Sequence, residues 1–240
     1  MTDPQTPVDL DVLLPVHNEA DRIEASLREI FAIVSGVARM RFIICEDGSR
    51  DGTREILTRL SGEFPMKLIL GEARKGYSQA MRDGMAAATA PYLLCLDSDG
   101  QCDPQNFAQF WNLRKDADVL LGWRVRRADP LLRRALSRFF YFFYQMLFRV
   151  PVHDPSCSLM LARKDVVERV APQVAEMREG FGWEFLARAR RRGFSIIELP
   201  IKHRARTCGS TQIYTLGKMP GIGYHHFRAL LKIWLQLKDH

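Results

Sequence analysis

The 240-residue chain lacks the features that mark disulfide-stapled or secreted proteins. Its five cysteines are odd in number and scattered, and none of them form a Cys-x-x-Cys pair, so the pattern indicates a reducing compartment. Residues 1–7 have no basic start followed by an apolar core, so they do not form a secretory signal. Internal repeats and low-complexity linkers are missing as well. The sequence therefore predicts one cytoplasmic α/β domain that covers residues 1–240.

Acidic residues are scarce in the second half of the chain. Residues 1–120 contain 13 Lys and Arg against 19 Asp and Glu, whereas residues 121–240 contain 22 against 9. The net charge of +7 therefore divides into an acidic half and a strongly basic half. A basic half suits nucleic acid, an anionic membrane surface or a phosphate-bearing substrate. Because no nucleic-acid reading motif is present, we expect no nucleic-acid partner.

Apolar runs alternate with helix-like segments along the first half. We expect strands over 10–16, 41–45, 66–70, 92–96 and 118–121, and helices over 20–34, 53–61 and 78–88. This alternation predicts a parallel sheet that is flanked by helices. Polar residues follow each strand, and the carboxyl ends of parallel strands border one crevice. We therefore expect these polar loops to converge.

The apolar run at 92–96 stops at two carboxylates one residue apart, Asp97 and Asp99. Acids at a strand end suit a divalent cation that holds a phosphate-bearing substrate. A calcium hand that starts at Asp97 is excluded, because Cys102 and Ala108 stand where it needs Gly and Glu. The nucleophile loop of a phosphohydrolase remains a weak alternative, since Gln101 takes the place of its usual Thr and three strand-like runs come first.

Two segments of the basic half combine apolar and basic residues. The segment 131–150 holds six consecutive aromatic residues at 139–144 and is bracketed by arginines, so it is not the run of ~20 apolar residues that crosses a bilayer. Near the C-terminus, helical spacing places Phe227, Leu230, Leu231 and Trp234 on one face. Two basic amphipathic helices favour peripheral attachment to a membrane. Ordinary packing of both helices against the domain is the alternative.

Taken together, the loop motifs resemble glycosyltransferase family 2, in particular the branch of dolichyl-phosphate mannose synthases and bacterial polyprenyl-phosphate glycosyltransferases. The matching segments are, in chain order, 14–19, 46–53, 75–76, 97–101, 154–157 and 206–210. The resemblance implies a GT-A fold, which is Rossmann-like with a mostly parallel central sheet, here with basic amphipathic interface helices. It also implies a nucleotide-diphosphate sugar donor, Mg²⁺ or Mn²⁺, and inversion at the anomeric carbon.

The resemblance also assigns roles to single residues. Residues 1–120 would form the nucleotide-sugar and metal half, and residues 121–240 the acceptor and membrane-facing half. The donor would contact Pro15, Val16, Asn18, Glu19, Asp47, Lys75 and Asp97. The catalytic metal site would comprise Asp97, Asp99 and Gln101, and the acceptor phosphate would meet Arg124, Arg134, Arg138 and Arg206. Glu46 and Ser158 depart from the family pattern, which usually has Asp and Gly there.

We therefore expect an inverting, metal-dependent transferase that moves a sugar from a UDP- or GDP-sugar to a polyprenyl phosphate, either undecaprenyl or dolichyl, at the cytoplasmic membrane face. A phosphate acceptor is already anionic, so it needs no dedicated base. The alternative is a family 2 enzyme with a hydroxyl acceptor on a saccharide or another lipid, which requires a positioned base. Glu184 is the candidate for that base, and an acid on a helix surface or one that anchors a loop is the alternative for this residue. A catalytically silent nucleotide-sugar or membrane-binding module is a further alternative.

Overall fold

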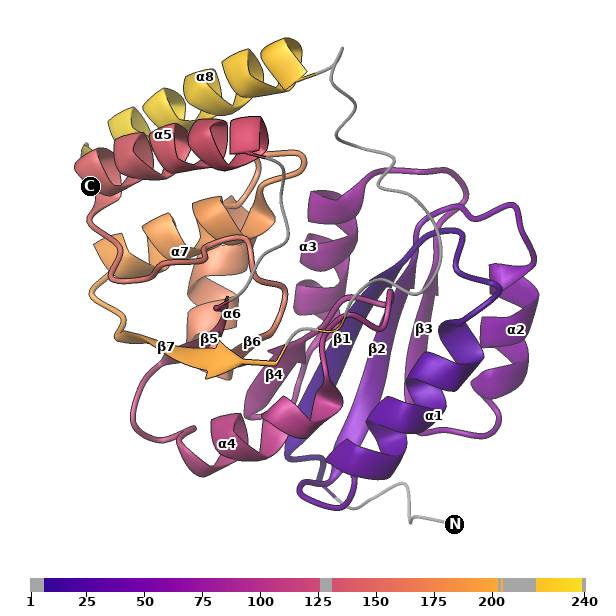
Figure 1. Cartoon of the computed structure of the whole chain (residues 1–240). Coiled ribbons are helices and arrows are strands. Elements are labelled where there is room, and N and C mark those ends of the chain that lie inside the picture. Colours follow the sequence, from indigo (N-terminus) through magenta and orange to yellow (C-terminus); the bar gives the residue numbers. More distant parts are fainter. Residues whose placement is uncertain (1–6, 126–130, 203, 205–218, 239–240) are drawn as a thin grey trace.

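The computed structural model describes residues 7–125, 131–202, 204 and 219–238, without the side chains of 131–137 and 219–222. A seven-stranded sheet with the order β3-β2-β1-β4-β6-β5-β7 lies at its centre (Figure 1). The strands are β1 (Leu10–Val16), β2 (Met40–Glu46), β3 (Met66–Leu70), β4 (Tyr92–Cys95), β5 (Val119–Arg124), β6 (Met160–Arg163) and β7 (Ile196–Ile201).

The sheet is mostly parallel, as the sequence predicted. β1, β2, β3 and β4 pair in parallel, and so do β5 and β7. The exception is β6, which runs antiparallel to both of its neighbours, β4 and β5. Because β6 is reversed, it begins at the sheet edge where β4 and β5 end. The segment before β6 therefore reaches the same edge as the loops that follow the parallel strands.

The helices lie on both faces of the sheet (Figure 1). They are α1 (Ile23–Val34), α2 (Thr53–Leu60), α3 (Tyr77–Ala87), α4 (Phe107–Asn112), α5 (Leu131–Phe148), α6 (Lys164–Val170), α7 (Phe181–Arg191) and α8 (Met219–Lys238), with short 3₁₀ turns at Pro104–Asn106 and Ala171–Gln173. α3 packs closely on β1 and β2 at Gly84. A larger residue would not fit there, because a Cβ on Gly84 would lie 2.1 Å from a methyl of Leu13. α1 covers the other face, where Phe31 contacts Phe42.

The first predicted helix begins three residues later than expected. The sequence predicted a helix from Ala20, but α1 starts at Ile23. The backbone N–H groups just before α1 bind side chains at the start of α2 and in the loop before it. Glu19 N donates to Thr53 Oγ1 at 2.9 Å, and Ala20 N donates to Asp51 Oδ2 at 3.1 Å. Tertiary hydrogen bonds therefore override the local helical pattern and hold this segment as a loop.

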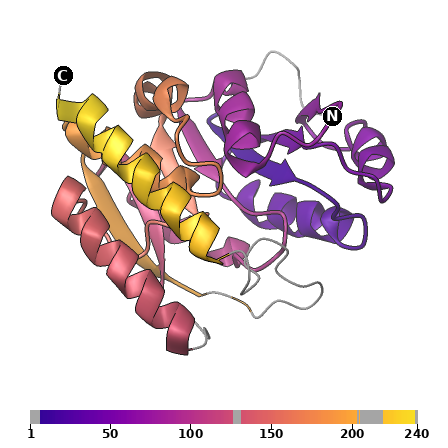
Figure 2. The same cartoon turned by 90° about the horizontal axis from the view of Figure 1, so that it is seen from above.

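α5 and α8 form a paired outer layer over α7, and Figure 2 shows them side by side from above. Phe227 of α8 packs against Phe139, Phe140 and Phe143 of α5 with ring centroids 4.9–5.8 Å apart. Both segments are helical, as the sequence predicted. The expected single apolar face of α8 was wrong in one respect, since Leu230 is fully buried whereas Leu231 is 46% exposed. Within the described ranges, no helix combines the length and apolarity needed to span a bilayer.

Candidate active site

The loops after the first three parallel strands converge, as predicted, and hydrogen bonds join them. Asn18, which follows β1, accepts from Arg50 N through Oδ1 at 3.0 Å and donates through its own N–H to Ser49 Oγ at 2.9 Å. Asp47, directly after β2, accepts from the backbone N–H groups of Lys75 and Gly76 at 2.6 and 2.9 Å. These contacts make one continuous wall from the ends of β1, β2 and β3.

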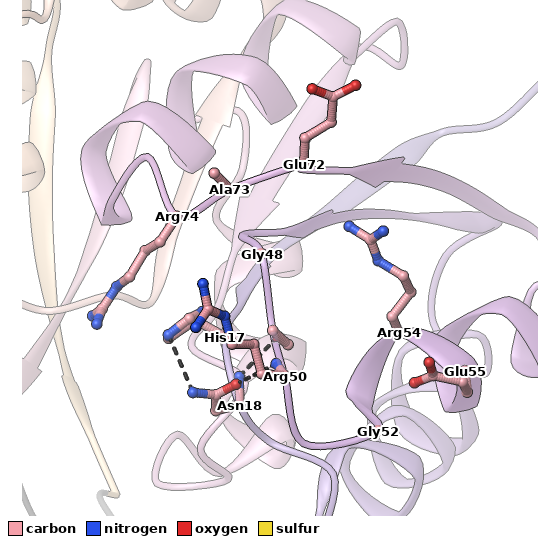
Figure 3. Close-up of a pocket in the computed structure, with 11 residues that line it drawn as sticks. His17, Asn18, Gly48, Arg50, Gly52, Arg54, Glu55, Glu72, Ala73 and Arg74 are labelled. Carbon is pink, nitrogen blue, oxygen red and sulfur yellow. Dashed lines mark hydrogen bonds between the residues drawn. The ribbon is translucent and has the colours of Figure 1, made fainter.

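A pocket of about 550 Å³ opens beside this wall (Figure 3). Its lining includes three arginines, Arg50, Arg54 and Arg74, against two acids, Glu55 and Glu72. The remaining lining residues are His17, Asn18, Gly48, Ser49, Gly52 and Ala73. The volume lies within the ~300–1,000 Å³ range of small-molecule sites, and the excess of arginine suits an anionic ligand. Sequence reasoning missed Arg50 and Arg54, although both follow the second strand inside or next to a quoted motif.

Some of the predicted donor residues belong to the pocket or its wall, and the side chains of the others are buried or engaged in ion pairs. Asn18 lines the pocket, and Asp47 lies in its wall. Pro15 and Val16 are buried in β1, where the Val16 carbonyl accepts from Asp47 N at 2.8 Å. Glu19 forms an ion pair with Arg22 at 2.9 Å, and the Lys75 ammonium pairs with Asp83 at 3.1 Å, so Lys75 meets the wall through its backbone.

Glu46, the departure from the usual Asp-Asp pair, braces the pocket wall. Its buried carboxylate accepts from Ser49 N and forms an ion pair with Arg54 at 3.1 Å. Arg54 also donates to the carbonyl of Gly71, which follows β3. Glu46 therefore fixes an arginine of the pocket and joins the loops after β2 and β3.

The predicted metal ligands Asp97, Asp99 and Gln101 follow the end of β4. The turn is tight: Gly100 has φ of 70°, a left-handed conformation that favours glycine, and Gln101 N donates to Asp99 Oδ1 at 3.1 Å. Asp97 accepts from the hydroxyl of Tyr77, with an oxygen separation of 3.3 Å. Burial and the charge of Asp99 raise the pKa of Asp97 to about 6, against the opposing effects of Ser158, Arg124 and Tyr77.

This donor set fits a divalent cation. The carboxylates of Asp97 and Asp99 and the amide of Gln101 stand within five residues of the chain, and oxygen ligands of this kind suit Mg²⁺ or Mn²⁺. Burial is the main cause of the raised pKa of Asp97 and the charge of Asp99 adds to it, and a nearby cation would favour the ionised form. Over the described part of the chain, no group of three or more His, Cys, Asp and Glu residues could hold a metal.

Of the predicted acceptor-side arginines, Arg124 lies at the end of β5. At the end of β5 its guanidinium donates to both oxygens of Asp154 at 2.7 and 2.9 Å and to Ser156 Oγ at 2.8 Å. Burial lowers the pKa of Arg124, but the hydrogen bonds and charge of Asp154 outweigh it and raise the pKa overall. Arg138 is exposed on α5, whereas the side chain of Arg134 and the whole of Arg206 lie outside the described residues.

The structure gives Glu184 a different role from the base of the hydroxyl-acceptor alternative. Its fully buried carboxylate accepts from the backbone N–H groups of Ala175, Glu176 and Met177 at 2.8–3.1 Å and from Arg188 at 2.8 Å. Four donors therefore occupy its oxygens, and no surface remains for a substrate hydroxyl. Glu184 is a loop anchor in the first turn of α7, which corrects the sequence-based hypothesis.

Comparison with known proteins identifies the family. The family model for glycosyl transferase family 2 matches residues 11–171. A dolichyl-phosphate hexose transferase of Haloferax volcanii is 27% identical over 234 residues, which cover 95% of each chain. A dodecaprenyl-phosphate galacturonate synthase of Rhizobium johnstonii is 28% identical over 174 residues. That match covers 70% of this chain and 52% of the relative, so it spans about half of the relative's length.

Solved structures show the same fold at low identity. Glucosyl-3-phosphoglycerate synthase from Mycobacterium tuberculosis, in complex with Mn²⁺, UDP and glucosyl-3-phosphoglycerate, superposes with a TM-score of 0.69 at 17% identity, over 94% of this chain and 80% of that one. TarS of S. aureus, in complex with UDP-GlcNAc, gives 0.65 at 14% identity, over 94% and 66%. The mostly parallel sheet flanked by helices is thus the predicted GT-A fold. The match of the family model over most of the chain shows that this protein belongs to glycosyltransferase family 2, and it is a nucleotide-sugar glycosyltransferase.

Proposed function

We propose that this glycosyltransferase moves a sugar from a nucleotide-diphosphate sugar to a polyprenyl phosphate at the cytoplasmic face of a membrane. The observation that carries the proposal is the pairing of two elements: a strand-end acid site beside an arginine-lined pocket, and an outer layer of two helices with exposed apolar side chains. The names of the Haloferax and Rhizobium relatives, which specify dolichyl- and dodecaprenyl-phosphate, support the same acceptor class.

On the donor side, the pocket would take the nucleotide. Asp47 would orient the loop of Lys75 and Gly76 against the base and ribose, because its two backbone hydrogen bonds fix that loop. Arg50, Arg54 and Arg74 supply positive charge where the nucleotide is negative. Asp97, Asp99 and Gln101 would hold Mg²⁺ or Mn²⁺, which when bound neutralises charge on the departing diphosphate.

On the acceptor side, an oxygen of the lipid phosphate would attack the anomeric carbon while the bond to the diphosphate breaks, which inverts that carbon. The attacking oxygen carries its charge already, so no side chain has to remove a proton. This agrees with the loss of Glu184 as a base candidate. Arg124, at the end of β5, is the described arginine that would meet the acceptor phosphate, with Asp154 and Ser156 holding its fork in place.

The outer helix layer would rest on the membrane. Phe139, Phe142 and Met146 recur at helical spacing on α5 and are 58–68% exposed, and Tyr224, Leu231 and Leu235 are exposed on α8. Arg138, Arg149, Arg228 and Lys238 are exposed on or next to the same two helices. Apolar side chains that insert at the acyl boundary and cations at the level of anionic headgroups are the two contributions to interfacial binding.

The test is transfer of sugar into lipid. Purified protein is incubated with Mn²⁺ or Mg²⁺ and a panel of UDP- and GDP-sugars, with and without a polyprenyl phosphate, and sugar in the lipid fraction is measured. We expect transfer that requires both the metal and the lipid phosphate, and its loss in Asp99→Ala. Asp116→Ala, at an exposed position, is the matched control. Donor hydrolysis without a lipid product would contradict the acceptor assignment, and full activity of Asp99→Ala would contradict the metal site.

A further inference from the structure

The helix α3 begins without a capping side chain of its own. Its N-cap residue is Gly76, which has no side chain to accept from the first N–H groups of the helix. A distant loop supplies the acceptors. Ser78 N donates to the carbonyl of Arg178 at 3.4 Å, and the buried Ser78 hydroxyl lies 2.6 Å from the carbonyl oxygen of Met177 and 2.7 Å from that of Arg178. The start of α3 is therefore capped by a segment 100 residues further along the chain.

We call residues 174–178 the bridge loop. Its backbone N–H groups at 175–177 all donate to the buried carboxylate of Glu184 at 2.8–3.1 Å. Its carbonyls at 177 and 178 are the acceptors for Ser78. The donors of this backbone are thus engaged by α7 and its acceptors by α3, so the bridge loop joins these two helices.

The outer helix α8 holds the one acidic side chain of the same loop. Glu176 forms an ion pair with Lys232 at 2.9 Å and accepts from the Gln236 amide at 3.0 Å. The Gln236 oxygen accepts in turn from Arg188 at 2.7 Å, and Arg188 is the buried partner of Glu184. α8 therefore contacts the bridge loop both directly and through the ion pair of α7.

This contact lies next to the side chains that the proposed function places in the membrane. Leu231 and Leu235 are 46% and 56% exposed, and they immediately precede Lys232 and Gln236 in the chain. A lipid surface that takes up these two leucines also restrains the helix that holds Glu176. The position of the bridge loop thus depends on a helix that the membrane would hold.

The other end of the connection reaches the donor pocket. Lys75 and Gly76, directly before the capped turn, donate their backbone N–H groups to Asp47 in the pocket wall at 2.6 and 2.9 Å. Arg74, one residue earlier, lines the pocket itself. A shift of the first turn of α3 would pull these three residues along the wall. The cap that the bridge loop supplies therefore helps to fix one side of the pocket.

We propose that the bridge loop couples α8 to the donor pocket, with Ser78 and Glu176 as its positioning residues. Membrane contact by α8 and nucleotide binding then favour each other, because each restrains the same loop and the second ligand finds part of the ordering already done. Such coupling is reciprocal, so vesicles raise the affinity for nucleotide by the factor by which nucleotide raises the affinity for vesicles. The inference rests on the proposed function, since it takes the pocket as the nucleotide site and α8 as a membrane-facing helix.

The experiment measures this factor in both directions. Binding of labelled UDP and GDP is measured by equilibrium dialysis in the presence of Mn²⁺, with and without vesicles of phosphatidylcholine and phosphatidylglycerol. Binding to the same vesicles is measured by co-sedimentation, with and without the nucleotide that binds. Couplings between two sites typically amount to ~5–150-fold, and in the wild type we expect one common factor at the lower end of this range.

Two variants interrupt the connection at different points. Ser78→Ala removes the hydroxyl between α3 and the bridge loop, and Glu176→Ala removes both direct contacts of the loop with α8. In each variant we expect vesicles to leave the nucleotide affinity nearly unchanged, whereas Ser78→Thr, which keeps a hydroxyl, should retain the factor. Ser61→Ala and Glu168→Ala are the matched controls at exposed positions on or next to other helices, and they should retain it as well.

The ratio of affinities separates coupling from general damage, because a merely structural loss would weaken nucleotide binding equally with and without vesicles. If either folded variant, Ser78→Ala or Glu176→Ala, keeps the wild-type factor, the inference is overturned. It is also overturned if the wild type binds nucleotide and vesicles without mutual effect, and in both cases the proposed function stands. If the wild type binds no vesicles or neither nucleotide, the proposed function is overturned instead. The two substitutions are at separate positions, so a folding defect in one leaves the other as a test.

Discussion

Two buried carboxylates, Asp47 and Glu184, use their oxygens to bind backbone N–H groups of neighbouring loops. Their neighbours in sequence differ, since Asp47 stands between Glu46 and Gly48 and Glu184 between Trp183 and Phe185, but both carboxylates do the same thing. Asp47 lies at the carboxyl end of β2 in the pocket wall, whereas Glu184 lies beneath α8 with Arg188. A carboxylate is a pure acceptor, so it gathers orphaned donors wherever a loop turns sharply. The role of such an acid depends on what that loop does.

Glu184→Gln tests the anchor role. The amide keeps one acceptor oxygen but leaves the buried Arg188 without its charged partner, and breaking a buried ion pair costs about 3–5 kcal/mol. We expect the free energy of unfolding, measured by chemical denaturation, to fall by about this amount. The folded fraction should transfer sugar at nearly the wild-type rate.

Glu168→Gln on α6 is the matched control, because Glu168 is exposed and its ion pair with Lys164 at 3.5 Å contributes little. Wild-type stability together with a large loss of kcat in Glu184→Gln would restore the base hypothesis.

At the scale of elements, the long regular patterns were predictable from sequence and the short ones were not. β1 and β3 match their predicted bounds, β2 is one residue longer at each end, and β4 ends one residue earlier. These runs are apolar and bounded by turn residues, so local pattern and burial agree. β6, with four residues, has no pattern of its own, and its reversed direction comes from pairing with β4 and β5. The contact of Tyr77 with Asp97 also depends on tertiary structure, so no spacing in the sequence could have indicated it.

The outer faces of α5 and α8 give a prediction for membrane binding. Phe142 and Met146 are 68% and 58% exposed, and burying such side chains fully contributes about 1.5–3 kcal/mol each. Only the exposed part of each side chain is newly buried on insertion, so Phe142→Ser with Met146→Ser should weaken binding to phosphatidylglycerol-containing vesicles by roughly 20–500-fold, as measured by co-sedimentation. Val37→Ser, at an exposed apolar position after α1, should leave binding unchanged. Equal binding by the double variant and the wild type would show that this face does not enter the bilayer.

His226 of α8 predicts how acid affects the same layer. Burial lowers its pKa below the ordinary value of 6.5, against the opposing charge of Glu179 and with a smaller contribution from His225, and Phe140 packs on its ring. As pH falls below about 6.5, the unfolded chain takes up this proton before the folded one, so stability is lost until the folded pKa is passed.

His226→Gln should remove this part of the loss, which is seen by comparing free energies of unfolding near pH 7.5 and pH 5.5. His225→Gln should keep most of the loss, because the exposed His225 is solvated in both states. Equal pH dependence in the wild type and His226→Gln would count against the effect.

At the scale of the whole molecule, the acid site and the pocket lie on β1–β4, while the outer basic layer lies over α7 and β7 (Figure 1). The uneven distribution of charge in the sequence thus corresponds to a spatial separation in the fold. Sequence predicted the two halves because charge is additive along a chain. It could not predict how they join, because that depends on the pairing of the sheet.

Ligand binding should stabilise the whole molecule if the donor site is as proposed. A ligand at 100 times its Kd adds about 2.7 kcal/mol to the stability of the form that binds it. We expect UDP with Mn²⁺ to raise the melting temperature, and a chelator to remove most of the increase. In Asp99→Ala the increase in melting temperature that depends on Mn²⁺ should be lost, whereas in Asp116→Ala it should remain. A melting temperature that ignores both UDP and Mn²⁺ in the wild type would contradict the site.

The reversed strand β6 also has a mechanical consequence. β6 connects the two parallel parts of the sheet. It forms four residue pairs with β4 and three with β5. On the other side of β5 the ladder to β7 is longer, with six pairs. The first residue of β6, Met160, pairs with Cys95 at the end of β4, two residues before Asp97. A change in the angle between the two parallel parts of the sheet would therefore act through β6 next to the acid site.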